Sequence, residues 1–183
     1  MPTGGVTVEN LSEWFGNGAL AVGIGSGLTG FDGGGDYEMI ARVVEQFTSP
    51  AHASDSMAEL FKSIVLSVVV RNGDAHLKNF GLLYTTPHQS DVRLSPLFDV
   101  VNTTCYIPKD VLAINLAKTK SWPCRKELVE FGKRICHVDR ADDVIDSIAD
   151  AAETYVPLIE TGEIWPMIKK EIEVDARVLL PAR

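Results

Sequence analysis

The residues best suited to chemistry gather in one short stretch, residues 71–79, which read RNGDAHLKN, and at Asp99 further along. The carboxylate of Asp74 can accept the proton of an attacking hydroxyl group. The amide oxygen of Asn79 and the carboxylate of Asp99 can bind magnesium, which prefers oxygen ligands. We expect a short hairpin to return Asp99 to the other two. Such a set fits phosphoryl transfer from a nucleotide to a hydroxyl group.

The spacing of these residues points the same way. Four residues separate Asp74 from Asn79, as in the protein-kinase catalytic loop, and Asp99 stands where the metal-binding aspartate of a kinase is expected. Residues 72–80 and 94–100 resemble the HipA family of bacterial serine/threonine kinase toxins. The signature of that family is an N-x-D-x-H-x-K-N loop, followed by leucine, a small residue, proline and an aromatic-Asp-hydrophobic triplet.

The segments beside the loop also resemble this family, at residues 7–16 and 31–40, so the resemblance covers roughly residues 7–175. It implies ATP as phosphate donor, Mg²⁺ as cofactor and a protein serine or threonine as acceptor. In known members the acceptor is an aminoacyl-tRNA synthetase. It also implies a toxin–antitoxin module, in which a DNA-binding antitoxin is the partner.

The resemblance assigns a role to each residue of the set. Asp74 is the expected base, and Asn79 and Asp99 are expected to bind Mg²⁺ and the nucleotide. Lys78, a compact cation beside the metal ligand, is expected to neutralise phosphate oxygens, although a solvated surface lysine is the alternative. Arg71 and Asn72 are expected to tie the loop to the rest of the lobe.

His76 has two possible functions. It can brace the loop through hydrogen bonds to the backbone, or it can bind a metal ion with Asp74 and Asp99 in a phosphohydrolase. The chain has only four histidines and none lies four residues from another, whereas a zinc or dinuclear site normally needs more ligands. Bracing is therefore the favoured interpretation.

A complete kinase also needs a nucleotide lobe, with a phosphate-covering loop and a lysine on a strand. Members of the resembled family carry this lobe in an N-terminal half that has no counterpart in the sequence. We therefore expect the catalytic lobe alone, with weak ATP binding, completed by a second chain that carries the N-terminal lobe or by a longer protein. A binding module without catalysis is the alternative.

Residues 17–35 contain eight glycines and are expected to form a mobile loop. Gly25, Gly27 and Gly30 satisfy Gly-x-Gly-x-x-Gly, but the segment lacks the Gly-Lys-Ser/Thr ending of a phosphate-binding loop and has no helix opening behind it. A phosphate cradle is therefore the less favoured interpretation of this segment.

The 183 residues suit one domain, residues 1–183, with 45% hydrophobic and 23% charged residues, which is ordinary for a globular protein. The net charge of −8 argues against a nucleic-acid-binding surface. No run approaches the roughly 20 apolar residues of a membrane span. Without a secretory leader, and with an odd number of cysteines, Cys105, Cys124 and Cys136, a cytoplasmic protein with reduced thiols is expected.

Hydrophobic periodicity predicts a mainly α fold with a small β hairpin. The resemblance implies that this fold is a kinase-like C-terminal helical lobe, with the hairpin at the catalytic loop. The helix that starts near Ser54 or Asp55 is expected to be buried nearly all round, because its length outweighs the strand preference of its β-branched end. Asp36 is expected to cap the helix at residues 37–47, and Asp139 the helix at 141–156. The helices are expected at residues 8–15, 37–47, 54–70, 125–136, 141–156 and 165–173, and the strands at 80–84 and 92–95.

Overall fold

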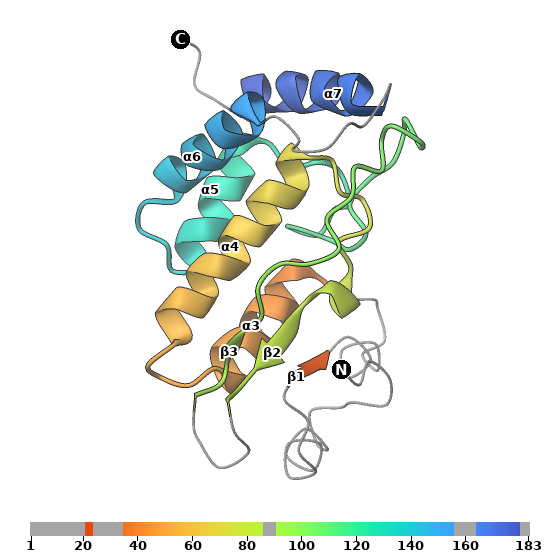
Figure 1. The fold of residues 1–183 in the computed structure, drawn as a ribbon. Coiled ribbons are helices and arrows are strands. Elements are labelled where there is room, and N and C mark those ends of the chain that lie inside the picture. Colours follow the sequence, from red (N-terminus) through yellow and green to blue (C-terminus); the bar gives the residue numbers. More distant parts are fainter. Residues whose placement is uncertain (1–20, 24–34, 86–90, 156–163, 180–183) are drawn as a thin grey trace.

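The computed structural model describes residues 21–23, 35–85, 91–155 and 164–179, and within them the fold is mainly helical (Figure 1). The predicted fold class, helices with a small hairpin at the catalytic loop, is confirmed. The predicted helix at residues 8–15 and most of the predicted loop at 17–35 lie outside the described residues. The elements in chain order are β1 (Ala21–Gly23), α3 (Tyr37–Phe47), α4 (Ala53–Val69), the 3₁₀ turn η1 (Leu77–Asn79), β2 (Gly81–Leu83), β3 (Arg93–Leu94), α5 (Arg125–Arg134), α6 (Ala141–Thr154) and α7 (Ile164–Leu179).

Helix α3 forms with the predicted bounds and the predicted cap. The Asp36 carboxylate accepts a hydrogen bond from the Met39 amide at 2.6 Å, which satisfies one of the unpaired N–H groups of the first turn. Tyr37, Ile40 and Val44 recur at helical spacing and are fully buried. The apolar stripe therefore faces the core, and the first turn of α3 lies beside the catalytic loop.

Helix α4 connects the parts of the lobe, because it contacts α3, α6, α7 and β3. Its predicted burial on several faces is confirmed by Leu60, Phe61 and Val65, none of which is exposed. The predicted caps, Ser54 and Asp55, are wrong. The helix begins at Ala53, after His52, whose carbonyl already accepts a hydrogen bond from the Ser56 amide.

The predicted hairpin is present as β2 and β3, which pair antiparallel with Leu82 opposite Leu94. A third strand corrects the loop predicted at residues 17–35, because Ala21–Gly23 pairs antiparallel with β2. The edge of β3 that faces away from β2 is covered by two serine side chains, one from the connection between α3 and α4 and one from α4. The Ser49 hydroxyl accepts from the Val92 amide at 2.8 Å, and the Ser56 hydroxyl accepts from the Leu94 amide at 3.1 Å.

The three C-terminal helices form a connected group on the other side of α4 (Figure 1). Residue Arg140, not the predicted Asp139, precedes α6 at the N-cap position, and no side chain caps this helix. The Arg125 guanidinium joins the group, donating to the Asp146 carboxylate and to the Leu179 carbonyl, each at 2.6 Å. Gly132 lets α5 approach α4, since a β-carbon there would lie 2.7 Å from the Phe61 ring.

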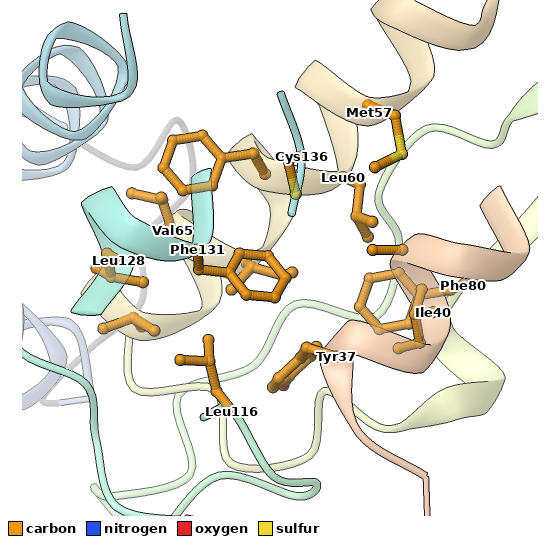
Figure 2. Close-up of a cluster of buried hydrophobic side chains, with 14 of the residues drawn as sticks. Tyr37, Ile40, Met57, Leu60, Val65, Phe80, Leu116, Leu128, Phe131 and Cys136 are labelled. Atoms are coloured by element: carbon orange, nitrogen blue, oxygen red, sulfur yellow. The ribbon is translucent and has the colours of Figure 1, made fainter. Parts of the chain in front are cut away.

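The core lies where the helices meet the segment that follows η1 and the loop before α5. Figure 2 shows side chains from α3, α4, α5 and the two loops converging on one cluster. Leu116, Leu128 and Phe131 bring the C-terminal half of the chain into the same core as α3. Packing of this kind makes the bounds of the helices depend on tertiary contacts as well as on local sequence.

Replacement of Ile64 by alanine tests the central role of α4. This side chain is 1% exposed, so we expect Ile64→Ala to lower the free energy of unfolding by about 2–5 kcal/mol, through lost burial and a residual cavity. Lys62→Ala is the control on the same helix, because Lys62 is exposed and only pairs with Glu59. Denaturant titration measures both. An equal, small effect of the two variants would contradict a buried α4.

Candidate active site

The predicted catalytic loop, residues 71–79, begins where α4 ends. The chain turns at Arg71, which has a positive φ of 54°, a conformation uncommon for residues other than glycine. The Asn72 backbone N–H donates a hydrogen bond to the Ser67 carbonyl at 2.8 Å. The Arg71 guanidinium lies 4.7 Å from the centre of the Trp122 ring. The predicted tie between residues 71–72 and the lobe is therefore present, through both backbone and side chain.

The structure joins Asn79 and Asp99, the two predicted metal ligands. The Asn79 amide group donates to the Asp99 carboxylate at 2.9 Å. On its other side the Asn79 amide oxygen accepts from the His76 backbone N–H at 3.0 Å. Since Asn79 is only 4% exposed, the two bonds hold its amide in one orientation, with the nitrogen toward the Asp99 carboxylate and the oxygen toward the loop backbone.

Asp99 itself is held in an uncommon backbone conformation, with φ of 58°. Non-glycine residues in this region cost free energy unless the surroundings enforce the geometry, and such residues concentrate at functional sites. The surroundings here are Asn79, which binds the carboxylate, and the buried Asn72, whose amide group approaches the Asp99 carbonyl at 3.4 Å. The exposed carboxylate of Asp99 is thereby fixed against the loop.

The segment after Asp99 fastens the start of the loop. The Asn102 amide group donates to the Val70 carbonyl at 2.9 Å. The Thr103 hydroxyl donates to the Arg71 carbonyl at 3.1 Å and accepts from the Gly73 amide at 2.9 Å. The loop and the Asp99 segment are thus joined by side-chain bonds at several consecutive positions.

The start of helix α3 contacts residues 75–80 of the loop and its end. The Tyr37 hydroxyl donates to the Ala75 carbonyl at 2.8 Å, and its ring meets the Phe80 ring edge to face, with 6.2 Å between the ring centres. Gly35, just before this helix, lies so close to Leu77 that a β-carbon would come within 2.7 Å of that side chain. The start of α3 is therefore a platform for residues 75–80.

The other predicted site residues, Asp74, His76 and Lys78, are not part of the Asn79–Asp99 contact. Asp74 and Lys78 are exposed, so both can meet a substrate. Bracing of the loop by the His76 ring stays a prediction, because the ring lies at the capping position of η1 without a side-chain cap hydrogen bond among the described residues. In the part of the chain that the structure describes, its buried Nδ1 has no hydrogen-bond partner, and the contacts to the loop come from its backbone instead. Within the loop itself, the Asn79 side chain accepts a hydrogen bond from the His76 backbone.

The donor set of the site is suited to a hard cation. Asn79 and Asp99 present oxygen atoms, which suit magnesium, and magnesium usually takes its other ligands from water and substrate phosphates. A phosphohydrolase would need a larger set. Over the described ranges, no group of three histidine, cysteine, aspartate or glutamate side chains could hold a metal ion by itself.

The loop-fastening residues Asn102 and Thr103 were missed by sequence reasoning. They follow Asp99 in the run Val-Val-Asn-Thr-Thr, where polar residues with no periodicity resemble any turn. Tyr37 was assigned to the core, correctly, but its buried hydroxyl was not considered. A buried tyrosine needs a hydrogen-bond acceptor, which is the one signal that could have pointed to the loop.

A family model for the HipA-like C-terminal domain matches residues 21–156, which is more than half of the chain. The chain belongs to this family. The match contains the whole catalytic loop and Asp99, so the predicted family is confirmed. No helix within the described residues is long and apolar enough to cross a membrane.

Known proteins resemble the domain over part of their length. A Sinorhizobium fredii (strain NBRC 101917 / NGR234) protein named "Putative kinase Y4dM" is 31% identical over 147 residues, which cover 79% of this chain and 32% of that protein. A Haemophilus influenzae (strain ATCC 51907 / DSM 11121 / KW20 / Rd) protein named "Putative kinase" is 34% identical over 70 residues, 38% of this chain and 19% of that one. The chain thus spans about a third or less of these two relatives.

A solved structure shares the fold. It is described as the Shewanella oneidensis MR-1 toxin–antitoxin system HipA, HipB and its operator DNA complex. The match has a TM-score of 0.57 and 16% identity, and covers 81% of this chain and 36% of the matched chain. At this identity the likeness concerns the fold, which agrees with the family assignment.

The close approach at Gly73 can be tested by mutation. A β-carbon at this position would lie 2.7 Å from the Thr103 hydroxyl and would overlap the Asp110 carboxylate. We expect Gly73→Ala to lower the free energy of unfolding by about 1–3 kcal/mol, as is typical of overpacking. Adding Asp110→Ala should restore part of this loss. Chemical denaturation of both variants, with the exposed Lys78→Ala as control, gives the answer, and an unchanged Gly73→Ala variant would contradict the described packing.

Proposed function

We propose that this chain is the catalytic lobe of a protein serine/threonine kinase that acts as the toxin of a toxin–antitoxin module. The observation that carries the proposal is the Asn79–Asp99 pair, bonded at 2.9 Å, on the same loop as the exposed carboxylate of Asp74. A metal-binding pair beside an accessible base is the arrangement that phosphoryl transfer uses.

In the proposed reaction Asp74 is the general base. Its carboxylate takes the proton of a serine or threonine hydroxyl as the hydroxyl oxygen bonds to the γ-phosphorus of ATP. The bond between that phosphorus and the bridging oxygen breaks, and ADP leaves with the electron pair. Because Asp74 is exposed at the surface of the loop, a protein acceptor can reach it without opening the lobe.

Asn79 and Asp99 are the residues that would hold Mg²⁺ in this proposal. When bound, the ion neutralises charge on the nucleotide phosphates. The hydrogen bond from the Asn79 amide group orients the Asp99 carboxylate toward one side of the loop before any ligand arrives. Lys78, exposed and adjacent to Asn79, supplies a cation for the transferring phosphate oxygens.

The nucleotide lobe is supplied from outside these 183 residues in this proposal, either on a separate chain or in a longer protein. The relatives named as kinases support this point, because the chain aligns with about a third or less of their length. A DNA-binding antitoxin is the proposed partner, by analogy with the Shewanella complex of HipA, HipB and operator DNA. Since the chain carries a net charge of −8, DNA contacts are assigned to the partner. An aminoacyl-tRNA synthetase is the proposed acceptor, and the cytoplasm the proposed location.

A non-catalytic binding module is the second candidate function. The observation in its favour is the same partial coverage of the relatives, which leaves ATP without its usual contacts to adenine and phosphates. The two functions differ in one measurable property, the transfer of phosphate once the lobe is completed.

Nucleotide binding by the 183-residue chain alone tests the need for a second lobe. We expect no ATP binding at micromolar concentrations, with or without Mg²⁺, because a complete kinase takes much of its contact from a phosphate-covering loop and a strand lysine. Isothermal titration calorimetry is the measurement. Low-micromolar affinity would contradict the need for a second lobe in ATP binding.

Replacement of Asp74 by asparagine tests the base in the completed kinase. An amide keeps the shape of the side chain and cannot take a proton, so we expect Asp74→Asn to lower phosphate transfer by about 10²-fold or more. Asp99→Asn should be similarly damaging, through the metal. Transfer from radiolabelled ATP to a purified aminoacyl-tRNA synthetase is the assay.

The matched control is Asp55→Asn, an exposed carboxylate in the first turn of α4. It should transfer phosphate at the rate of the unmodified protein. Full activity of Asp74→Asn would remove the catalytic assignment. A completed kinase that phosphorylates no protein would instead favour the binding module.

A further inference from the structure

We propose that two hydroxyl groups, those of Thr103 and Tyr37, position the catalytic base Asp74 from its two sides. The inference rests on the proposed function and extends it to two positioning residues that contact neither substrate nor metal. Thr103 lies on the segment that follows Asp99, and Tyr37 is the first residue of α3. Both act on the backbone of the loop rather than on the Asp74 side chain.

Asp74 needs such anchors because its own side chain does little to hold it. The carboxylate is exposed, and in the described part of the chain its hydrogen bonds are made by its backbone groups. Its amide donates to the Asn72 side chain at 3.1 Å, and its carbonyl accepts from the His76 amide at 2.8 Å. The direction of the carboxylate therefore depends on the backbone path through residues 72–76.

The Thr103 hydroxyl fixes that path on the N-terminal side. It donates to the Arg71 carbonyl at 3.1 Å and accepts from the Gly73 amide at 2.9 Å, so one oxygen atom bridges two residues immediately before Asp74. The Thr103 amide adds a second bond to the Arg71 carbonyl at 3.0 Å. These bonds hold Arg71 in its left-handed conformation, φ 54°.

Thr103 approaches the loop closely at Gly73. A β-carbon on Gly73 would lie 2.7 Å from the Thr103 oxygen, so the contact requires glycine at position 73. Glycine is otherwise the residue that loses most freedom on ordering. A flexible residue directly before the base is therefore immobilised by a side chain from another segment.

The Tyr37 hydroxyl fixes the path on the C-terminal side. It donates to the Ala75 carbonyl at 2.8 Å, one residue after Asp74. Burial raises the pKa of this hydroxyl far above its ordinary value, so it remains a protonated donor at every pH at which the protein works. The edge-to-face contact with Phe80 fixes the ring.

Thr103 also couples the base to the metal-binding residue. Asp99 and Thr103 lie on one short segment, which contacts the loop through Asn79, Asn72 and Asn102 as well. A displacement of this segment would move Asp74 and Asp99 together. Their relative position, on which in-line transfer depends, is therefore kept by the same bonds.

The test uses the completed kinase with radiolabelled ATP and a purified aminoacyl-tRNA synthetase as acceptor. We expect Thr103→Val and Tyr37→Phe each to lower kcat by about 10-fold or more, with the KM for ATP within about twofold, because misplacement of a catalytic group affects the chemical step. Thr103→Ser retains the hydroxyl and should keep most of the activity.

Two control variants separate positioning from general stability. Thr48→Val removes a buried threonine hydroxyl that bonds the Val44 carbonyl at the end of α3. Tyr84→Phe removes a buried tyrosine hydroxyl at the end of β2 away from the catalytic loop. Both should leave kcat per folded molecule unchanged, as measured beside the melting temperature of every variant.

Each outcome decides a different question. Unchanged kcat in Thr103→Val and Tyr37→Phe, with an active unmodified enzyme, would overturn the positioning role. Equal losses in Thr103→Ser and Thr103→Val would overturn it for Thr103, because the hydroxyl would then be irrelevant. An unmodified enzyme that transfers no phosphate would overturn the proposed function, and the positioning role with it.

Discussion

The site depends on one constraint, that the backbone polar groups of a loop must find partners once the helix before it has ended. Between Val69 and Gly81 the chain has only the short 3₁₀ turn η1, Leu77–Asn79, to supply them. Side chains from distant segments do so instead, namely Tyr37 from α3 and Asn102 and Thr103 from the stretch after Asp99. The bonds that satisfy these buried polar groups are therefore also the bonds that fix the geometry of the predicted site.

Periodicity was sufficient to predict α3 and α4, since their apolar stripes are long and regular, whereas α7 extends six residues beyond the predicted end at residue 173. The spacing of Asp74, Asn79 and Asp99 was sufficient to predict the family and the meeting of Asn79 with Asp99.

The caps of α4 and α6 were wrong, because the residues near a helix start compete for the position and packing decides among them. Strand β1 was missed, since a glycine-rich segment becomes a strand only by pairing with β2. The role of Thr103 depends on a contact across 30 residues, which no local pattern contains.

The predicted site combines buried side chains, held by hydrogen bonds, with exposed charged side chains. Asn72 and Asn79 are almost fully buried, whereas Asp74, Lys78 and Asp99 are exposed. The buried amides have fixed hydrogen-bond partners, so the backbone that carries the exposed charged groups is held in place. In the proposed kinase, the residues that would act on a substrate are thus attached to a backbone that is already held in place.

The two serine hydroxyls at the edge of β3 have a consequence for assembly. Unpaired N–H groups along a sheet edge attract strands from other chains, and proteins protect such edges in several ways. Ser49 and Ser56 occupy the outward N–H groups of Val92 and Leu94. In the three-stranded sheet of the described residues, the order β1-β2-β3 leaves β1 as the opposite edge. Within the described residues, two serine hydroxyl groups thus close the β3 edge of the sheet to a strand from another chain.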